Sequence, residues 1–281
     1  MSITMQRIAI AIGVIGLAGY VLYLALEVGF NKAARDKQQL TAKLDTLRAA
    51  GVPVDTQSLD AWYRNRTDET NTKAWLKIFQ TLNSPKFQTQ SQGVETFSKD
   101  SRTSSRKHDQ WPGEGPVREL LAQTTELREE IQSLSKARKP VQLPLQFNLV
   151  LVTLEHINSF RATARLIALE LDAAIADRNS AQITASAQTL LNIAEIFRGE
   201  PFISHLYVVY AIRGLAFSGL KEALERSLLE PQDLEMLAKN LSQEPPPFEN
   251  FSDVVHGELS LTISEYFTLP DPSKKKVLVW V

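Results

Sequence analysis

The longest hydrophobic stretch in the chain extends from Ile8 to Leu26 and contains no charged residue. As a helix it would be about 29 Å long, close to the thickness of the hydrocarbon core of a membrane. It is longer than the apolar core of a signal peptide, and no small-residue cleavage site follows it. A buried core helix fits less well, because the stretch lies near the start of the chain between Arg7 and a charged segment. The pattern therefore predicts an uncleaved transmembrane anchor over residues 1–30.

A helical stalk is predicted directly after the anchor, over residues 31–52. Leu40, Leu44 and Leu47 fall on one stripe of this segment, and no Gly or Pro interrupts it before Gly51. Glycine is typical of the position that ends a helix. The stripe has the spacing of a coiled coil, over a length of two heptads. We expect the anchor and the stalk to form one continuous helix that ends near Gly51.

Residues 53–83 and 84–116 differ in their content of large apolar side chains. The first range predicts short helices, and the clearest of them carries apolar residues at helical spacing, namely Trp75, Ile78, Phe79 and Leu82. The second range is rich in Ser, Gln, Thr, Lys and Gly, and it offers few apolar groups to offset the entropy of chain ordering. We therefore expect residues 84–116 to form a flexible polar excursion that can contain short ordered pieces, with a functional loop as the alternative.

Residues 117–269 have the pattern of a helical bundle, and residues 270–281 follow it as a tail. Amphipathic segments separated by Pro, Gly and turn residues predict helices at 117–134, 149–177, 180–198, 202–229, from 231 onward and at 248–267. Ser180 is a suitable N-cap for the third of these helices. Their short connections favour antiparallel pairs, and the pair around Asn179 resembles one helix–turn–helix unit of a tetratricopeptide-like repeat. No second copy follows at a fixed period, so the fold predicted is an all-α, irregular antiparallel bundle.

The same periodicity predicts which side of each helix faces the core. In the helix at 149–177 these residues are Ile157, Phe160, Ala164, Ile167, Ala168, Leu171 and Ile175. In the helix at 180–198 they are Ile183, Ala187, Leu190, Ala194 and Phe197. In the helix at 202–229 they are Leu206, Val209, Tyr210, Phe217, Leu220 and Leu224.

Two charged residues interrupt the expected apolar faces. Arg213 lies in the middle of the stripe on the helix at 202–229, and Glu258 lies beside Val254 and Val255 on the last helix. A buried charge without a partner is strongly destabilising, so each of these residues needs one. We predict that Arg213 and Glu258 meet across the helix packing as a bidentate pair. Such a pair would fix the register of the helices or form a polar spot for an acidic ligand or partner side chain.

Composition narrows the classes of partner. The chain has 281 residues, 43% of them hydrophobic, and a formal net charge of −1. This is enough for one sizeable core beyond the anchor, whereas a nucleic-acid partner would require a basic face. The absence of cysteine excludes a disulfide scaffold and thiolate metal sites, and it leaves the redox compartment undetermined. The expected partners are the membrane bilayer and another envelope protein. A nucleic-acid partner is not expected.

The charges around the anchor bear on its orientation. Arg7 precedes the anchor, whereas Lys32, Arg35, Lys37 and Lys43 follow it. A literal positive-inside count places the C-terminal domain in the cytoplasm, but long domains translocate largely regardless of charge. A very short tail before a single span favours an N-terminus on the inside. We therefore expect a single-pass membrane protein with an extracytoplasmic C-terminal domain.

No motif in the chain indicates a particular chemistry. The sequence contains no P-loop, no glycine-rich dinucleotide loop, no G-x-S-x-G and no H-E-x-x-H. Its four histidines are isolated in sequence. We accordingly predict no catalytic residue, no metal ligand and no cofactor. The favoured function is a non-enzymatic scaffold or protein-interaction domain of the cell envelope. The alternative is an envelope enzyme whose site assembles from residues scattered over several helices.

Three segments carry a resemblance to a known family. They are LDTLRAAGVPV at 44–54, ALELDAAIADRNSAQITASAQTLLNIAEIFRGEP at 168–201 and HGELSLTISEYF at 256–267. With the anchor before them, they resemble uncharacterised, membrane-anchored, all-helical proteins of planctomycete-type bacteria, over about residues 1–75 and 150–267. The resemblance implies no activity and no catalytic residue. Such proteins often extend further, so a truncated reading frame is one expectation for the end of this chain.

The predicted anchor gives a first test. Because one uninterrupted apolar helix would hold the protein in the bilayer, we expect the full chain to stay with the membranes after carbonate extraction. N-terminal sequencing of the mature protein should find residues of the apolar stretch. Release into the soluble fraction, or a mature protein that starts beyond residue 25, would contradict the anchor.

Overall fold

The computed structural model contains helices and no strand within the residues that it describes, which confirms the predicted all-α fold class. Described are residues 35–65, 68–94, 97, 111, 113–141, 143, 155–197, 200, 202–242 and 251–268. The helices are α2 (Arg35–Ala49), α3 (Thr56–Arg64), α4 (Glu69–Leu82), α5 (Pro85–Ser91), α6 (Glu114–Gln123), α7 (Thr125–Ser135), α8 (Glu155–Ala176), α9 (Ser180–Phe197), α10 (Ile203–Glu225), α11 (Pro231–Ser242) and α12 (Phe251–Thr268). The predicted anchor and tail lie outside the described residues. The chain divides into two compact units, 1–54 and 55–281, each described by itself.

In the first unit, helix α2 ends in a Schellman motif. Gly51 adopts a left-handed backbone with φ of 77°. Its N–H donates to the carbonyl of Arg48 at 2.9 Å, and the N–H of Val52 donates to the carbonyl of Leu47 at 3.0 Å. Glycine tolerates this conformation because it lacks a Cβ. The predicted helix end at Gly51 is therefore confirmed, while residues 31–34 of the predicted stalk lie outside the described part.

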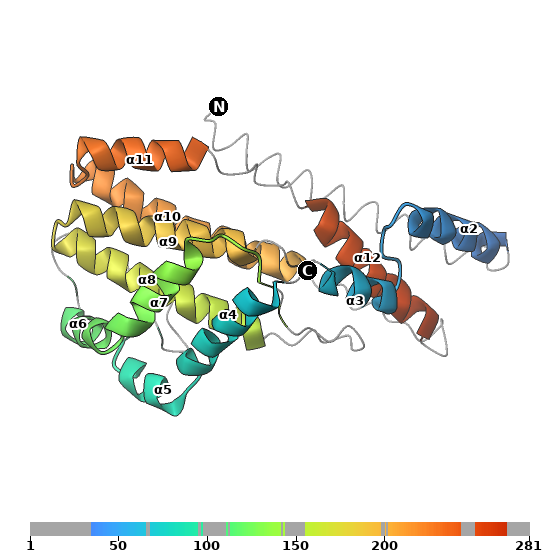
Figure 1. Cartoon of the computed structure of the whole chain (residues 1–281), viewed down its shortest axis with the longest axis horizontal. Coiled ribbons are helices and arrows are strands. Elements are labelled where there is room, and N and C mark those ends of the chain that lie inside the picture. Colours follow the sequence, from blue (N-terminus) through green and yellow to red (C-terminus); the bar gives the residue numbers. More distant parts are fainter. Residues whose placement is uncertain are drawn as a thin grey trace. The chain divides into compact units, whose positions relative to one another are not determined.

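In the second unit, α8, α9 and α10 lie side by side (Figure 1). A tight turn joins α8 to α9, with Arg178 in a left-handed conformation at φ of 56°. The side chain of Asn179 accepts the N–H of Gln182 at 3.1 Å and so caps α9. The hydroxyl of Ser180 donates instead to Asp233 of α11. The prediction of Ser180 as the N-cap is therefore wrong by one residue, because its hydroxyl links two helices.

Helix α9 is buried along almost its whole circumference. It packs against α8, α10, α7 and α11, so that polar as well as apolar positions are enclosed. The five residues predicted to face the core are all fully buried, namely Ile183, Ala187, Leu190, Ala194 and Phe197. The predicted face of α8 is confirmed as well, with Ala168 partly buried against the core. These two helices therefore form the centre of the bundle.

The predicted face of α10 is wrong by about a quarter of a turn. Phe217 and Leu224, expected inside, are 48% and 53% exposed. The side that packs on α8 and α9 carries small and mid-sized residues, namely His205, Val208, Val209, Ile212, Ala216, Gly219, Leu220 and Ala223. Because apolar residues occur all around this helix, periodicity alone does not identify its buried side. Close packing identifies it, since a Cβ on Gly219 would lie 2.4 Å from Leu171 of α8.

Aromatic rings join α4 to the central helices. The predicted apolar stripe of α4 is confirmed, with each of its four residues at most 3% exposed. The ring of Phe160 on α8 is stacked on Phe197 of α9 with the centroids 3.8 Å apart. It also lies edge-on to Phe79 at 4.8 Å and stacks with Trp75 at 6.1 Å. This cluster buries a large apolar area where the shorter helices meet the bundle.

Two further segments refine the sequence-based expectations. The predicted excursion at 84–116 contains one ordered piece, α5, whose N-cap is Ser84 and whose first residue is Pro85. The flexibility of the rest of the range stays a prediction. Phe87 of this helix is 4% exposed and lies edge-on to Phe97. The helix predicted at 117–134 is divided into α6 and α7 at Thr124, whose hydroxyl donates to the carbonyl of Leu120 at 2.7 Å. Local hydrogen bonding of this kind competes with helix continuation.

One helix of the described part, α10, is long and apolar enough to cross a membrane by length and composition alone. It is not the N-terminal stretch for which an anchor was predicted. A core helix meets the same criterion, and 44% of the apolar window of α10 is buried against the rest of the chain. Because its buried side packs on α8 and α9, we interpret α10 as a helix of the bundle.

Two glycines on α10 provide a matched test of this packing. Gly219→Ala should destabilise the fold by about 1–2 kcal/mol, because the new methyl group overlaps Leu171. Gly214→Ala should stabilise it by about 0.5–1 kcal/mol, because a Cβ there meets no atom of the chain within 4 Å and alanine favours the helix. Urea unfolding of the dilute full chain in mild detergent, followed by circular dichroism, measures both changes. Equal effects of the two substitutions would contradict the packing of α10.

Candidate functional site

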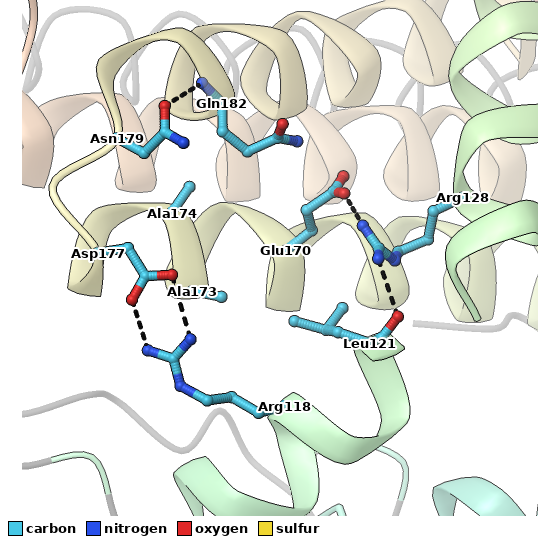
Figure 2. Close-up of a pocket in the computed structure, with 9 residues that line it drawn as sticks. All are labelled: Arg118, Leu121, Arg128, Glu170, Ala173, Ala174, Asp177, Asn179 and Gln182. Atoms are coloured by element: carbon cyan, nitrogen blue, oxygen red, sulfur yellow. Dashed lines mark hydrogen bonds and ion pairs between the residues drawn. The ribbon is translucent and has the colours of Figure 1, made fainter. Parts of the chain in front are cut away.

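A pocket of about 250 Å³ opens between α6, α7, α8 and α9 (Figure 2). Its mouth carries Arg118, which forms two hydrogen bonds with Asp177 at 2.6 and 3.1 Å and a third with Glu114 at 2.7 Å. These contacts raise the pKa of Arg118 and lower that of Asp177. The three side chains are about half exposed, so that water screens the pair and its contribution to stability is small.

A buried ion pair forms the inner wall of this pocket. Glu170 of α8 accepts from Arg128 of α7, from Gln132 at 2.8 Å and from the hydroxyl of Ser186 at 3.1 Å. Arg128 also donates to the carbonyl of Leu121 at 2.8 Å, and burial lowers its pKa. Both oxygens of the carboxylate therefore have donors within the chain. The charged groups of the pocket hold α6, α7, α8 and α9 together, and this arrangement favours a structural role over ligand binding.

A second group of titratable residues lies where α9 connects to α10. Glu200 is 2% exposed and accepts from the hydroxyl of Tyr63 on α3 at 2.5 Å and from the N–H of Leu143 at 3.1 Å. Burial raises the pKa of Glu200 to about 8, and burial beside this carboxyl raises the pKa of Tyr63. Glu200 is therefore neutral around pH 7 and joins three segments that are distant in sequence. Because it is enclosed, it is not accessible to a substrate from solvent.

The first turn of α10 adds a histidine and a carboxylate to this region. His205 is 2% exposed and lies against the rings of Phe197 and Phe202, and burial lowers its pKa to about 3. Glu258 of α12 accepts the N–H of Ile203 at 3.0 Å, and burial raises the pKa of its carboxyl. An acid at a helix N-terminus satisfies an N–H that has no partner within the helix. Glu258 thereby joins α12 to the start of α10.

The predicted pairing of Arg213 with Glu258 remains a prediction. The structure gives Arg213 a partner on α9, because its guanidinium pairs with the carboxylate of Glu195, and both side chains are about nine-tenths buried. Glu258 contacts the first residue of α10, which lies ten positions before Arg213, or about 15 Å along the helix. Each of the two charges thus has a contact of its own.

Most of the residues that form these polar contacts are absent from the sites predicted from the sequence. Glu170 gave a signal, because it is charged and lies between Leu169 and Leu171 in an apolar segment. Glu200 gave none, since it follows a helix end and its partner Tyr63 lies 137 positions earlier. Within the described residues, no group of three or more His, Asp or Glu side chains is placed to hold a metal ion.

The outward side of α10 forms an exposed apolar strip, which we call the α10 seam. Its members follow one another at alternating intervals of four and three residues, namely Ile203, Tyr207, Tyr210, Gly214, Phe217, Lys221 and Leu224. Four of the large side chains are between 40% and 57% exposed. At 100° per residue, the α10 seam lies nearly opposite the side that packs on α8 and α9. Five of the seven members are large apolar or aromatic residues, and such a strip, here interrupted by Gly214 and Lys221, is typical of an interaction surface.

Comparisons with protein-family models, curated proteins and solved structures found no match to this chain. The resemblance stated from the sequence therefore stays an expectation.

The environment of Glu200 predicts a dependence of stability on pH. The pKa of its carboxyl rises from 4.5 to about 8 in the folded chain, so the folded state holds a proton that the unfolded state releases. The stabilisation is complete below pH 4.5 and is lost as the pH rises towards 8, by about 1.4 kcal/mol per unit. The unfolding free energy of the native chain, minus that of the Glu200→Gln variant, should fall over this range. Glu235→Gln, on exposed α11, is the matched control, and a constant difference for Glu200→Gln would contradict the raised pKa.

Proposed function

We propose that this chain is a single-pass, membrane-anchored helical protein whose bundle binds another protein of the cell envelope and catalyses no reaction. The observation that carries the proposal is the α10 seam. Tyr207 and Phe217 are 57% and 48% exposed, although the chain has an extensive core in which to bury such rings. A large apolar side chain that becomes fully buried contributes about 1.5–3 kcal/mol, so several of them on one strip can support specific binding.

The bundle presents the α10 seam on a rigid support. Helix α10 packs along α9 and α8, and the ion pair between Arg213 and Glu195 fixes its position along α9. At the first turn, Glu258 of α12 accepts the N–H of Ile203. A rigid helix loses little conformational entropy when it binds, and this favours recognition by another helix or groove. In this proposal α8 and α9 act as a tetratricopeptide-like helix pair that supports the binding helix.

The polar sites of the bundle support binding over catalysis. In the pocket, the carboxylate of Glu170 receives three donors from the chain, and Arg118 is paired with two acids. The carboxyl with the raised pKa, Glu200, is enclosed and is engaged by Tyr63. A catalytic acid or base must reach the substrate, directly or through one water. In the proposed function, the expected anchor and stalk hold the bundle near an extracytoplasmic membrane surface, where it meets its partner.

Site-specific photocrosslinking in native membranes tests this function. A benzophenone amino acid replaces Phe217 in one variant and Ala122, on the exposed side of α6, in the control. We expect a crosslinked protein adduct of defined mass at position 217 and none at 122, because the partner covers only the α10 seam. Both variants should keep native stability within about 0.5 kcal/mol, since both positions are largely exposed. Equal adduct yields at the two positions, or no adduct at either, would sink the proposal.

A further inference from the structure

We infer that the α10 seam binds the α10 seam of a second copy of this chain, with the two helices antiparallel and a two-fold axis at Gly214. This inference rests on the proposed function and identifies the partner. The seven positions of the seam alternate between intervals of four and three residues, which is the spacing that helices use to pack along one another. Gly214 is the middle position of the seven. The other six positions therefore form three pairs at nearly equal distances from Gly214, so that the α10 seam can face a second copy of itself across a two-fold axis.

Gly214 has no packing role within the described chain. A Cβ built on it meets no atom within 4 Å, whereas a Cβ on Gly219 would overlap Leu171 of α8. Glycine inside a helix is destabilising relative to alanine, so a glycine without an internal contact is unfavourable for the single chain. Glycine does permit close approach of another backbone, as at the crossing point of two helices. Its place at the middle of the α10 seam is where two antiparallel helices would approach most closely.

The antiparallel arrangement matches the side chains on either side of the axis. Tyr210 of one copy would lie opposite Phe217 of the other, as an aromatic pair. Tyr207 would lie opposite Lys221, whose ammonium group can lie over the ring face. Ile203 would meet Leu224 at the ends of the seam. The two-fold axis repeats each of these contacts, so that every member of the α10 seam other than Gly214 would have a partner side chain in the second copy.

Charge favours the antiparallel over the parallel direction. Lys221 and Glu225 form an ion pair at the C-terminal end of the α10 seam, with their nitrogen and oxygen 3.7 Å apart. Parallel helices would place Lys221 against Lys221 and Glu225 against Glu225, and like charges at this position repel. Antiparallel helices place both residues against the end of the seam that contains Ile203 and Tyr207, where the nearby carboxyl of Glu258 accepts the N–H of Ile203. The antiparallel direction also aligns the helix dipoles favourably.

The area of the α10 seam is sufficient for a modest dimer. Helix α10 has 23 residues and is therefore about 35 Å long. Its half-exposed side chains would bury on the order of 600 Å² per copy, at the lower end of specific interfaces. Such a dimer would be weak in dilute solution, and confinement of two anchored copies to one membrane would raise their effective concentration. A two-fold axis along the membrane normal places both expected anchors on the same side.

Cysteine crosslinking tests the arrangement, because the native chain contains no cysteine. The full chain in its membrane is treated with a short thiol-to-thiol crosslinker. We expect Gly214→Cys to form covalent homodimers, since position 214 lies next to its own copy across the axis. Tyr207→Cys and Lys221→Cys should not form them singly, because each lies about 21 Å along the axis from its own copy. The double variant Tyr207→Cys/Lys221→Cys should form them, since residue 207 of one copy lies opposite residue 221 of the other.

Further variants make the result decisive. Ala122→Cys on α6 is the control for random collision and should remain monomeric. Adding Gly214→Leu to the double variant should reduce its crosslinking at least tenfold, because a side chain at the axis separates the helices, whereas a Cβ at this position meets no atom of its own chain within 4 Å. Efficient homodimers from Tyr207→Cys alone would overturn the antiparallel arrangement. Adducts only with other proteins would overturn the second copy as the partner but leave the proposed function standing. If no seam variant forms an adduct although a water-soluble maleimide labels its cysteines, both the dimer and the proposed function are overturned.

Discussion

A central helix that is buried on nearly every side needs a partner for each of its polar groups. Helix α9 carries several such groups, and burial of a polar group without a hydrogen bond costs more free energy than the bond itself contributes. The bundle meets this constraint at four residues of α9 with contacts to the surrounding segments, whereas the buried hydroxyl of Thr184 has no hydrogen-bond partner among the described residues. The pairs are Ser186 with Glu170 of α8, Asn192 with Arg138 after α7, Gln188 with Asn240 of α11 and Glu195 with Arg213 of α10. These contacts fix where each neighbour lies along α9.

The buried ion pairs determine the relative positions of the helices more than they increase the stability of the fold. The pairs Arg128–Glu170 and Arg213–Glu195 are largely enclosed, and the desolvation of such charges offsets much of their attraction. The pairs favour one arrangement of the helices, because any arrangement that separates the two partners leaves an uncompensated buried charge. Since Arg213 lies at the edge of the buried side of α10, its pairing with Glu195 also fixes the rotation of that helix. The ion pair within the core thus determines which residues α10 turns outward.

The sequence was sufficient wherever hydrophobic periodicity had a single interpretation. The faces of α4, α8 and α9 follow from their apolar spacing, and Gly51 ends α2 through the left-handed conformation that glycine favours. It was insufficient for α10, which is apolar on all sides, and at Thr124, where one hydroxyl divides the predicted helix into α6 and α7. The Tyr63–Glu200 contact was inaccessible to any local pattern, because it depends on how three distant segments fold together.

Helix α10 leaves two aromatic rings half exposed, which an isolated bundle would not favour. Its buried side combines the small residues Ala216, Gly219 and Ala223 with larger aliphatic ones, whereas Tyr207 and Phe217 lie on the exposed side. Small residues inside allow α10 to approach α8 closely, and that contact is strong because packing density, rather than side-chain size, determines dispersion energy. Half-exposed rings contribute less to the fold of one chain than buried rings would, and they increase its tendency to associate. In the proposed dimer, both sides of α10 would therefore follow one rule, with close packing within the chain on one side and between the two copies on the other.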